Sequence, residues 1–564
     1  MVWHIFKKDV RLLWPMSLFV VVAAALCALR TTLLGFFDQP VLDRLTFFLP
    51  YLVYLGVAIV AVTVVHQEAL SDSQEDWLIR PIRRRDLVLS KVLFVLLTVN
   101  VPLMIVDAVQ QLALHFTLSV SIGVAVSRAL VMVFAFSLPA LMLGAVTRSL
   151  IDAFVFGIVS AIGFAFLFMF ATSALNPALF GIGDQAGMLW ISVCAAGLVM
   201  LIGSAATLAF QYSTRRTPMA RGIGLAAVLA AMCTFVCLPR TAVIAIQESL
   251  WGSSNSGGIK LRFDPSHEWA RNDPERAPAY GSSFVPAKVV AARATEAARI
   301  DRQMAKIRLP LSISGLHPGD ILFADRIAVR LVAKTGGVLY EGAGVCTRGG
   351  AGVGATCSDN RLEVWASSAE TLAETMEIPV EQRLNLPIAV YQRIKDEPVR
   401  VEVLYALTRF VARSSQRINA TGDVQSLSEM GSCATRIDND ADEVELGCLT
   451  NVGVPSCAGV VLEDPQTNQR NPELHLCDPN YGPFHRIALE DAVERSELSI
   501  PFHDRSGLAH YPVGSAAIHR ARIEVTAYDA VGHFRSSVAM PDIRLVEWQL
   551  PSDPTESADT TARE

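Results

Sequence analysis

The cysteines of this 564-residue chain fall into two groups, and one of them could form disulfides or hold a metal. Four cysteines lie within apolar runs, where a thiol usually acts as a small buried side chain: Cys27, Cys194, Cys233 and Cys237. The polar second half carries the other six: Cys346, Cys357, Cys433, Cys448, Cys457 and Cys477. Their even number favours disulfides in an oxidising compartment, and their short separations favour pairing between neighbours in that order.

Two metal sites are the alternatives in the polar half. Zinc is disfavoured because no CxxC pair and no nearby His pair accompanies the cysteines. Calcium would require the acidic cluster that stands between Cys433 and Cys448: Asp438, Asp440, Asp442, Glu443 and Glu445. The EF-hand pattern fails there, because Glu443 stands where its central Gly belongs and Leu449 where its final Glu belongs. We therefore expect a solvated acidic loop and no metal site.

No constellation typical of catalysis occurs in the chain. The sequence contains no GxSxG or HExxH motif and no GxxxxGK[ST] phosphate-binding loop. We therefore expect no enzymatic activity and no cofactor in this chain, so any ATP-driven action would need a partner subunit. We expect no nucleic-acid partner either.

Charged residues gather in the segment Glu68–Lys91, EALSDSQEDWLIRPIRRRDLVLSK, which interrupts the apolar first half. Ser71 and Gln74 have the spacing of a capping box, which predicts a short helix that carries Trp77. That helix should end at Arg80, because a proline follows it. The segment then continues as a basic cluster.

The basic cluster comprises Arg83, Arg84 and Arg85, and Asp86 is placed to cap the next helix. That helix carries Lys91 into the bilayer. A short helix, a proline stop and a basic cluster between two membrane spans form a surface suited to docking a partner protein. The alternative is an ordinary basic cytoplasmic loop, which topology rules make common.

This segment resembles the cytoplasmic loop between the second and third spans of ABC-2-type transporter permeases. There, an acidic or polar helix is followed by a Pro-basic turn and a Lys that enters the third span, and the loop is the coupling helix that seats in a groove of the ATPase. The matching residues of this chain are Glu68, Glu75, Asp76, Trp77, Leu78, Arg80, Pro81, Arg83, Arg84, Arg85 and Lys91. The resemblance covers roughly the first 215 residues and implies a partner ATPase that binds ATP and Mg.

Composition divides the chain into an apolar half and a polar half. Residues 1–250 hold 16 Lys and Arg against 12 Asp and Glu, net +4, and the remainder has net charge −10. The first half contains seven apolar runs, each near the roughly 20 residues that cross a bilayer. They are Trp14–Phe37, Phe47–His66, Val92–Leu112, Ile122–Val146, Ile151–Thr172, Met188–Phe210 and Ile223–Ile246.

Loop charge sets the expected orientation. With a cytoplasmic N-terminus, 12 of the 16 basic residues of this half fall on the cytoplasmic side. An odd number of spans then places everything after Gln247 outside, where the cysteines also favour an oxidising compartment. Residues 1–13 should form an interfacial helix, with Trp3, Phe6, Val10 and Leu13 at helical spacing. This helix resembles the elbow helix that opens ABC-2 permeases.

Two ionisable residues within the spans could line a substrate path. Burying a charge in hydrocarbon costs at least a few kcal/mol unless the group is paired or hydrated. Asp107 and Arg128 lie towards the outer ends of neighbouring runs, so one interpretation is an ion pair at an outer mouth. The other is a pair of interfacial residues solvated by water.

The pattern changes to period two in the polar half. Strands are predicted where β-branched residues alternate: Ile307–Ser314, Ile327–Ala333, Val399–Ala406 and Ile523–Tyr528. We expect a linker with a helix over 248–306, a β-rich, sandwich-like domain over 307–550 and a disordered tail over 551–564. The stretch Gly431–Tyr481 should be a loop-rich insertion stapled by disulfides.

These features predict a polytopic α-helical membrane domain of six to seven spans over 14–247, followed by a β-rich extracytoplasmic domain. The expected protein is the membrane subunit of an ABC transporter, an exporter in the inner membrane, driven through segment 68–91 by a separate cytoplasmic ATPase. The family implies a homo- or heterodimer of membrane subunits in the lipid bilayer. The alternative is a membrane-anchored extracytoplasmic binding or sensory protein.

Overall fold

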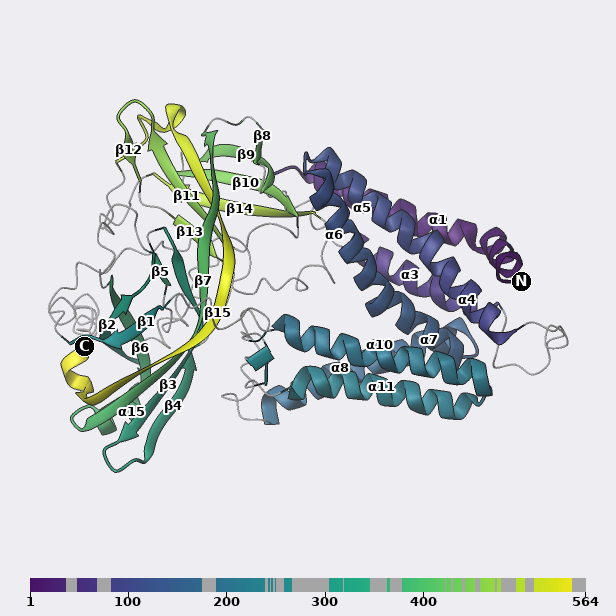
Figure 1. The fold of residues 1–564 in the computed structure, drawn as a ribbon, viewed down its shortest axis with the longest axis horizontal. Helices are drawn as coiled ribbons and strands as arrows, with labels where there is room; N and C mark the ends of the chain where they lie inside the picture. The colour runs from purple at the N-terminus through teal and green to yellow at the C-terminus, as the bar shows by residue number, and fades with distance from the viewer. Residues whose placement is uncertain are drawn as a thin grey trace, which may run out of the picture.

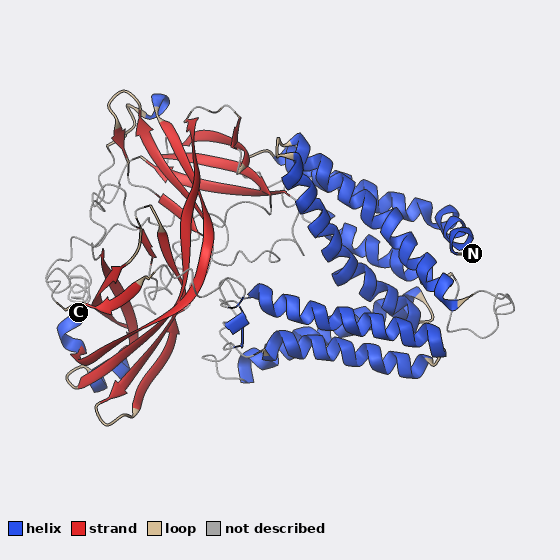
Figure 2. Cartoon of the chain, viewed as in Figure 1, coloured by secondary structure: helices blue, strands red, loops and turns tan. Residues whose placement is uncertain are grey.

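The chain builds two parts, a bundle of helices from the first half and a set of β-sheets from the second (Figures 1 and 2). The N-terminus lies at the end of the bundle that points away from the sheets (Figure 1). The computed structural model describes residues 1–36, 48–67, 83–174, 189–238, 258–265, 304–317, 319–344, 378–420, 424–427, 430–438, 442–451, 457–471, 493–502 and 512–549, with shorter pieces within 242–249, 363–365, 422 and 474–477.

The helices coincide with the apolar runs of the sequence. In chain order they are α1 (Val2–Leu34), α3 (Leu49–His66), α4 (Arg84–Val95), η2 (Leu96–Asn100), α5 (Val101–Ala113), α6 (Leu118–Val131), η3 (Met132–Ser137), α7 (Leu138–Val146), α8 (Leu150–Ala174), α10 (Leu189–Thr214) and α11 (Thr217–Cys237). The π-helical segments η2 and η3 continue their flanking α-helices without a break, so 84–113 and 118–146 are each one continuous helix.

Six helices within the described residues are long and apolar enough to cross a membrane, and a further apolar stretch at Leu150–Ser160 belongs to α8. Length and composition therefore indicate a multi-pass membrane protein. The core of the bundle is built by the valine face of α3, including Val57, Val60 and Val64, against Phe94 of α4. Close approach depends on small residues, since a Cβ on Gly144 of α7 would lie 3.1 Å from the backbone of Val62.

Two predicted boundaries differ from the structure. The predicted elbow, residues 1–13, is the first part of α1, which runs on through Pro15 without an element boundary at Leu13. The last predicted span, Ile223–Ile246, is replaced by α11, which starts earlier and ends at Cys237. Leu238 is extended, as expected of a residue that precedes a proline.

Within the described residues, the second half forms three antiparallel sheets. The three-stranded sheet has the order β1-β2-β6, the four-stranded sheet β14-β10-β9-β8, and the eight-stranded sheet runs β12-β11-β15-β7-β3-β4, with β13 on β11 and β5 on β3. The strands are β1 (Lys260–Phe263), β2 (Met304–Ser314), β3 (Ile321–Ala333), β4 (Val338–Gly344), β5 (Glu363–Trp365), β6 (Ile378–Pro387), β7 (Pro398–Asn419), β8 (Gln425–Leu427), β9 (Gly431–Asp438), β10 (Glu443–Asn451), β11 (Cys457–Asp464), β12 (Gln469–Arg470), β13 (Leu474–Cys477), β14 (Val493–Pro501) and β15 (Arg522–Arg544).

Two long strands, β7 and β15, hold the β-region together by pairing along most of their length. At one end they share a core with β2, whose alternate residues Ile307, Leu309, Leu311 and Ile313 are fully buried. At the other end they share a second core with β9, β10 and β11. The alternation of β-branched residues that predicted these strands therefore places one face of each strand in a core.

The predicted strands are confirmed as parts of longer ones, but two other expectations need correction. The predicted linker, 248–306, contains β1 and the start of β2. The helix expected in this range is contradicted where β2 begins, and the rest of it lies outside the described residues. The stretch Gly431–Tyr481 is not loop-rich, because it contributes β9, β10, β11, β12 and β13. A short helix, α15 (Ile388–Ile394), follows β6. The tail over 551–564 also lies outside the described residues.

Candidate functional site

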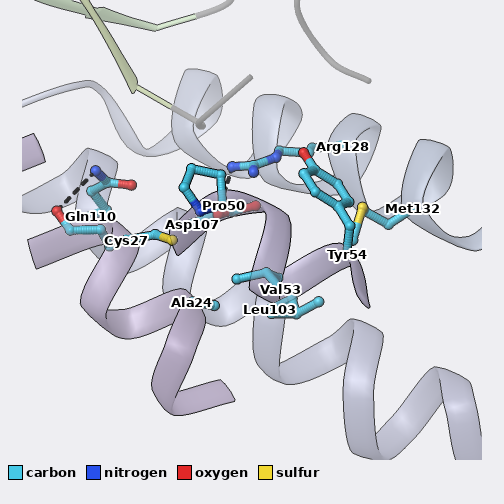
Figure 3. A pocket seen from close by; sticks show the side chains of 11 residues that line it. Ala24, Cys27, Pro50, Val53, Tyr54, Leu103, Asp107, Gln110, Arg128 and Met132 are labelled. Atoms are coloured by element: carbon cyan, nitrogen blue, oxygen red, sulfur yellow. Dashed lines mark hydrogen bonds and ion pairs between the residues drawn. The ribbon is translucent and has the colours of Figure 1, made fainter. Parts of the chain in front are cut away.

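A small cavity lies among four helices of the bundle (Figure 3). Helix α1 contributes Ala24, Cys27 and Ala28, helix α3 contributes Pro50, Val53 and Tyr54, helix α5 contributes Leu103, Asp107 and Gln110, and the continuous helix α6-η3 contributes Arg128 and Met132. The cavity volume is about 30 Å³, which leaves room for a few water molecules at most. The cavity as it stands is therefore too small for a solute much larger than water.

Asp107 and Arg128 form an ion pair in this cavity, with Arg128 Nη1 donating to Asp107 Oδ1 at 3.0 Å. Their side chains are 16% and 14% exposed, so both charges are largely removed from solvent. Gln110, one turn after Asp107, donates to the carbonyl of Ala28 at 3.2 Å and ties α5 to α1. The ion pair, which was one of the two interpretations of Asp107 and Arg128 drawn from the sequence, is thus present, and both apolar and polar walls surround it.

The two π-helical segments, η2 and η3, contact each other. Asn100, at the end of η2, donates from Nδ2 to Oγ of Ser137, at the end of η3, over 3.2 Å. Both side chains are buried. Each segment is followed by a proline two residues on, Pro102 or Pro139, and a proline in a helix cannot donate to the carbonyl four residues earlier. The widened turn accommodates this loss, and such turns occur often at functional sites.

A second buried ion pair fixes the other end of the bundle. Lys91 of α4 donates from Nζ to Oδ2 of Asp9 in α1 at 2.9 Å, and the side chains are 2% and 0% exposed. Lys91 is the only member of the predicted coupling segment with a described ion pair. The pair anchors the helix that follows the predicted coupling loop to the first helix of the bundle.

Most of the predicted coupling segment, Glu68 to Ile82, lies outside the described residues. That part includes Glu75, Asp76, Trp77, Leu78, Arg80 and Pro81. Arg83 is exposed and immediately precedes α4, and Arg85 is exposed in its first turn. Asp86 was expected to cap this helix, but the N-cap position is Arg83. Asp86 lies three residues later, in the first turn, where its negative charge interacts favourably with the helix N-terminus.

The bundle touches the β-region where α5 turns into α6. The α5 terminus has the bonding of a Schellman motif, with Phe116 N donating to Gln111 O at 3.2 Å and His115 at φ 67°. This turn directs Phe116 into a small core with Leu449 and Val493 of the β-region. Ser432 adds a hydrogen bond from Oγ to the carbonyl of Leu114 at 2.9 Å.

Two glycines make this contact possible. A Cβ on Gly431 would lie 2.3 Å from Cζ of Phe116, and a Cβ on Gly447 would lie 2.3 Å from the carbonyl oxygen of Phe36, just beyond α1. Both glycines belong to the β9–β10 pair. The ends of α1 and α5 therefore rest on the same strand pair of the four-stranded sheet.

The same strand pair carries a disulfide between Cys433 and Cys448, which face each other in register. This pairing is the one expected from their spacing. Cys457 is also disulfide-bonded and lies opposite Cys477 across β11 and β13. Cys346 and Cys357 lie outside the described residues. Among the described residues no group of three or more His, Cys, Asp or Glu side chains could hold a metal ion.

The residues of this architecture that were not singled out from the sequence include Asp9, Asn100 and Ser137. A signal existed for the last two, because Asn100-Val101-Pro102 and Ser137-Leu138-Pro139 repeat a polar-x-Pro pattern in neighbouring runs. Asp9 was also visible as the one acidic residue among Lys7, Lys8 and Arg11. Its partner could not be read from the sequence, since it is 82 positions away.

No family model matches this chain, and no curated protein matches it. Among solved structures, red sea bream transglutaminase is similar over 45% of this chain and 33% of its own, at 7% identity and a TM-score of 0.11. A bacterial adhesin from Mobiluncus mulieris with intramolecular disulfide, isopeptide and ester bond cross-links is similar over 43% of this chain and 91% of its own, at 8% identity and a TM-score of 0.11. This chain spans about a third of the transglutaminase chain, and neither similarity is close enough to support a relationship.

Proposed function

We propose that this protein is the membrane subunit of an ATP-driven transporter of the ABC-2 type. ATP and Mg would bind in a separate cytoplasmic ATPase, and segment 68–91 would receive the motion of that ATPase. The chain itself carries no enzymatic site in this proposal. The membrane subunits would act as a homo- or heterodimer, and export is the expected direction of transport.

The observation that carries the proposal is the continuous helix formed by α4, η2 and α5. It begins directly after Arg83, where the predicted coupling loop ends, and it reaches the turn that packs on the β-region. At about 1.5 Å per residue, residues 84–113 span about 45 Å, which is enough to cross a bilayer. A rigid element of this kind can carry a displacement from one membrane face to the other.

The disulfide and the position of the N-terminus support the proposed orientation. Cys433 and Cys448 are bonded in the β-region, and structural disulfides persist in oxidising compartments. The N-terminus lies at the opposite end of the bundle (Figure 1), as a cytoplasmic N-terminus and an extracytoplasmic C-terminal half would require. The proposed location is the inner membrane of the cell.

The cavity at Asp107 and Arg128 is the proposed outer part of the substrate path. The ion pair lies on neighbouring helices. Asp107 stands seven residues, or about 10 Å, before Leu114, and Arg128 stands ten residues, or about 15 Å, after the start of α6 at Leu118. Separation of α5 from α6 would break the pair and offer both charges to a polar substrate. In the alternative, Asp107 and Arg128 are solvated interfacial groups, and their ion pair only holds α5 against α6.

The test is purification of the tagged full-length protein from its native membrane in mild detergent. Co-purifying proteins are identified by mass spectrometry, and ATP hydrolysis is measured in the eluate. We expect a cytoplasmic ATPase with Walker motifs to co-purify. The variant Trp77→Asp and the charge reversal of Arg83, Arg84 and Arg85 should lose it while the protein still inserts into the membrane.

Matched controls are Trp3→Asp, an exposed Trp at the same end of the bundle, and Arg148→Glu in the turn after α7. Both should retain the ATPase. If Trp77→Asp retains it as well, the coupling assignment fails. If the eluate contains only envelope or signalling proteins and no ATP hydrolysis, the protein is an anchored binding or sensory protein instead.

A further inference from the structure

An apolar groove runs along the surface of the bundle between α1 and α3. Its walls are Pro15, Met16, Phe19 and Val20 of α1 and Leu52, Leu55, Gly56, Ile59 and Val60 of α3. The groove has a volume of about 350 Å³. It forms because Gly56 has no side chain, so that α3 can approach Val20, whose Cγ2 would lie 2.7 Å from a Cβ at that position. Phe19 stands at its edge with 58% of its surface exposed.

Basic side chains stand at one end of this groove. Lys8, Leu12, Pro15 and Phe19 follow one another at i, i+4, i+7 and i+11, a spacing that places them along one face of α1. Lys8 is exposed, and Arg11 is exposed one turn before Pro15. At about 1.5 Å per residue, the charged groups start about 12 to 16 Å before Phe19 along the helix axis. This face of α1 therefore changes from positively charged to apolar over a distance comparable to the depth of a lipid headgroup region.

We propose that this groove binds one anionic phospholipid, with an acyl chain between α1 and α3 and the phosphate near Lys8 and Arg11. The walls of the groove offer almost no polar atoms, which suits a hydrocarbon chain. The basic end supplies the complementary charge for an anionic headgroup, and each Lys or Arg near a lipid surface strengthens binding by a factor of about five. This site is independent of the proposed transport function.

The experiment is a lipid titration of the delipidated full-length protein, followed by native mass spectrometry. Phosphatidylglycerol is the anionic probe, and phosphatidylcholine with the same acyl chains is the neutral one. We expect wild-type protein to bind one phosphatidylglycerol at least tenfold more tightly than phosphatidylcholine. Equal binding of the two lipids would overturn the proposal, because the basic end of the groove would then contribute nothing.

Two variants separate the headgroup from the acyl chain. Lys8→Ala/Arg11→Ala should weaken phosphatidylglycerol binding about 25-fold, since two basic side chains are lost, and should leave phosphatidylcholine nearly unchanged. Leu55→Trp fills the groove and should weaken binding of both lipids, by about fourfold for each methylene it excludes. The matched controls are Arg148→Ala/Arg215→Ala, two exposed arginines in turns at the same end, and Leu18→Trp, an exposed residue of α1 outside the groove.

The controls should bind both lipids as wild type does. If Leu55→Trp leaves lipid binding intact but converts an oligomer to a monomer, a second copy of the chain occupies the groove and the proposal fails. It fails equally if the control pair weakens phosphatidylglycerol binding as much as Lys8→Ala/Arg11→Ala does, because the effect would then be one of total charge.

Discussion

Nζ of Lys91 lies 2.9 Å from Oδ2 of Asp9, and neither side chain is more than 2% exposed. The pair joins α1 to α4 inside an apolar core that includes Leu13, Leu87 and Phe94. A buried ion pair contributes little net stability compared with apolar side chains of similar size, but the loss of one partner leaves a charge buried without compensation. Loss of either partner should therefore disturb the packing of α4 against α1.

Replacing Lys91 alone should destabilise the helical bundle. We expect Lys91→Met to lower the free energy of unfolding by about 3 to 5 kcal/mol, because the carboxylate of Asp9 stays buried without its ammonium partner. Thermal unfolding of the full-length protein in detergent measures the change. The double variant Asp9→Leu/Lys91→Met should recover most of the loss. If the single and double variants unfold at the same temperature, the pair has no specific role.

The hydrogen bond between Asn100 and Ser137 should stabilise the two π-helical segments against each other. Asn100→Ala and Ser137→Ala should show a coupling energy of about 0.6 kcal/mol, the average for side-chain hydrogen bonds in membrane helices. A double-mutant cycle of unfolding free energies measures it. Thr98→Ala is the control, because its hydroxyl bonds the carbonyl of Phe94 in its own helix. It should show no coupling to Ser137→Ala.

Gly431 should be essential for the contact between the bundle and the β-region. Gly431→Ala forces a methyl group to within 2.3 Å of the Phe116 ring and 2.4 Å of the Leu449 carbonyl, and it does so at a φ of +84°. Gly336→Ala is the matched control, because its φ is +89° and no atom lies within 4 Å of the new methyl. In both variants an alanine at positive φ adds about 1 to 2 kcal/mol of backbone strain.

Only Gly431→Ala should also disrupt the contact between the helical bundle and the β-region. We expect faster proteolytic release of the β-region from membranes that contain this variant than from those with Gly336→Ala. Equal rates of release would show that the contact at Phe116 does not hold the parts together.

The β-region should lose stability in acid through Asp464. This buried carboxylate accepts hydrogen bonds from Arg520 Nε at 3.0 Å and Nη2 at 2.7 Å, and from Gln466 N and Thr467 Oγ1. The bond to Arg520 holds the pKa of Asp464 well below its ordinary value of 3.8, against the opposing effect of burial. Asp464 therefore binds a proton more readily in the unfolded chain than in the folded one. The stabilisation by its ion pair is complete above pH 3.8 and is lost as the pH falls below that value.

Asp464→Asn should thus destabilise the protein at neutral pH, and the difference from wild type should shrink as the pH falls below about 4. Chemical unfolding monitored at a series of pH values measures it. Asp529→Asn is the control, because that carboxylate is 46% exposed and its nitrogen partner on Arg413 is 3.6 Å away. It should have little effect at any pH. A pH-independent difference for Asp464→Asn would contradict the role of the ion pair.

The sequence by itself determined where the helices and many strands lie. Runs of about 20 apolar residues can satisfy their backbone within a membrane only as helices. Six of the seven predicted runs accordingly correspond to α1, α3, the continuous helices 84–113 and 118–146, α8 and α10, and the seventh only overlaps α11. Alternation likewise located β2, β3, β7 and β15. The local pair Cys433–Cys448 could also be predicted, from the short separation of the two cysteines, whereas the β9–β10 pairing that sets them in register came only from the structure.

Tertiary structure alone decided which distant residues meet. Asp9 and Lys91 are 82 positions apart, and Ser432 reaches Leu114 over 318 positions. Such contacts depend on the packing of helices and on glycines that allow close approach, and neither periodicity nor composition carries that information. The sequence placed Asp107 and Arg128 on neighbouring helices, but their ion pair exists because the Schellman turn at His115 folds α6 back along α5.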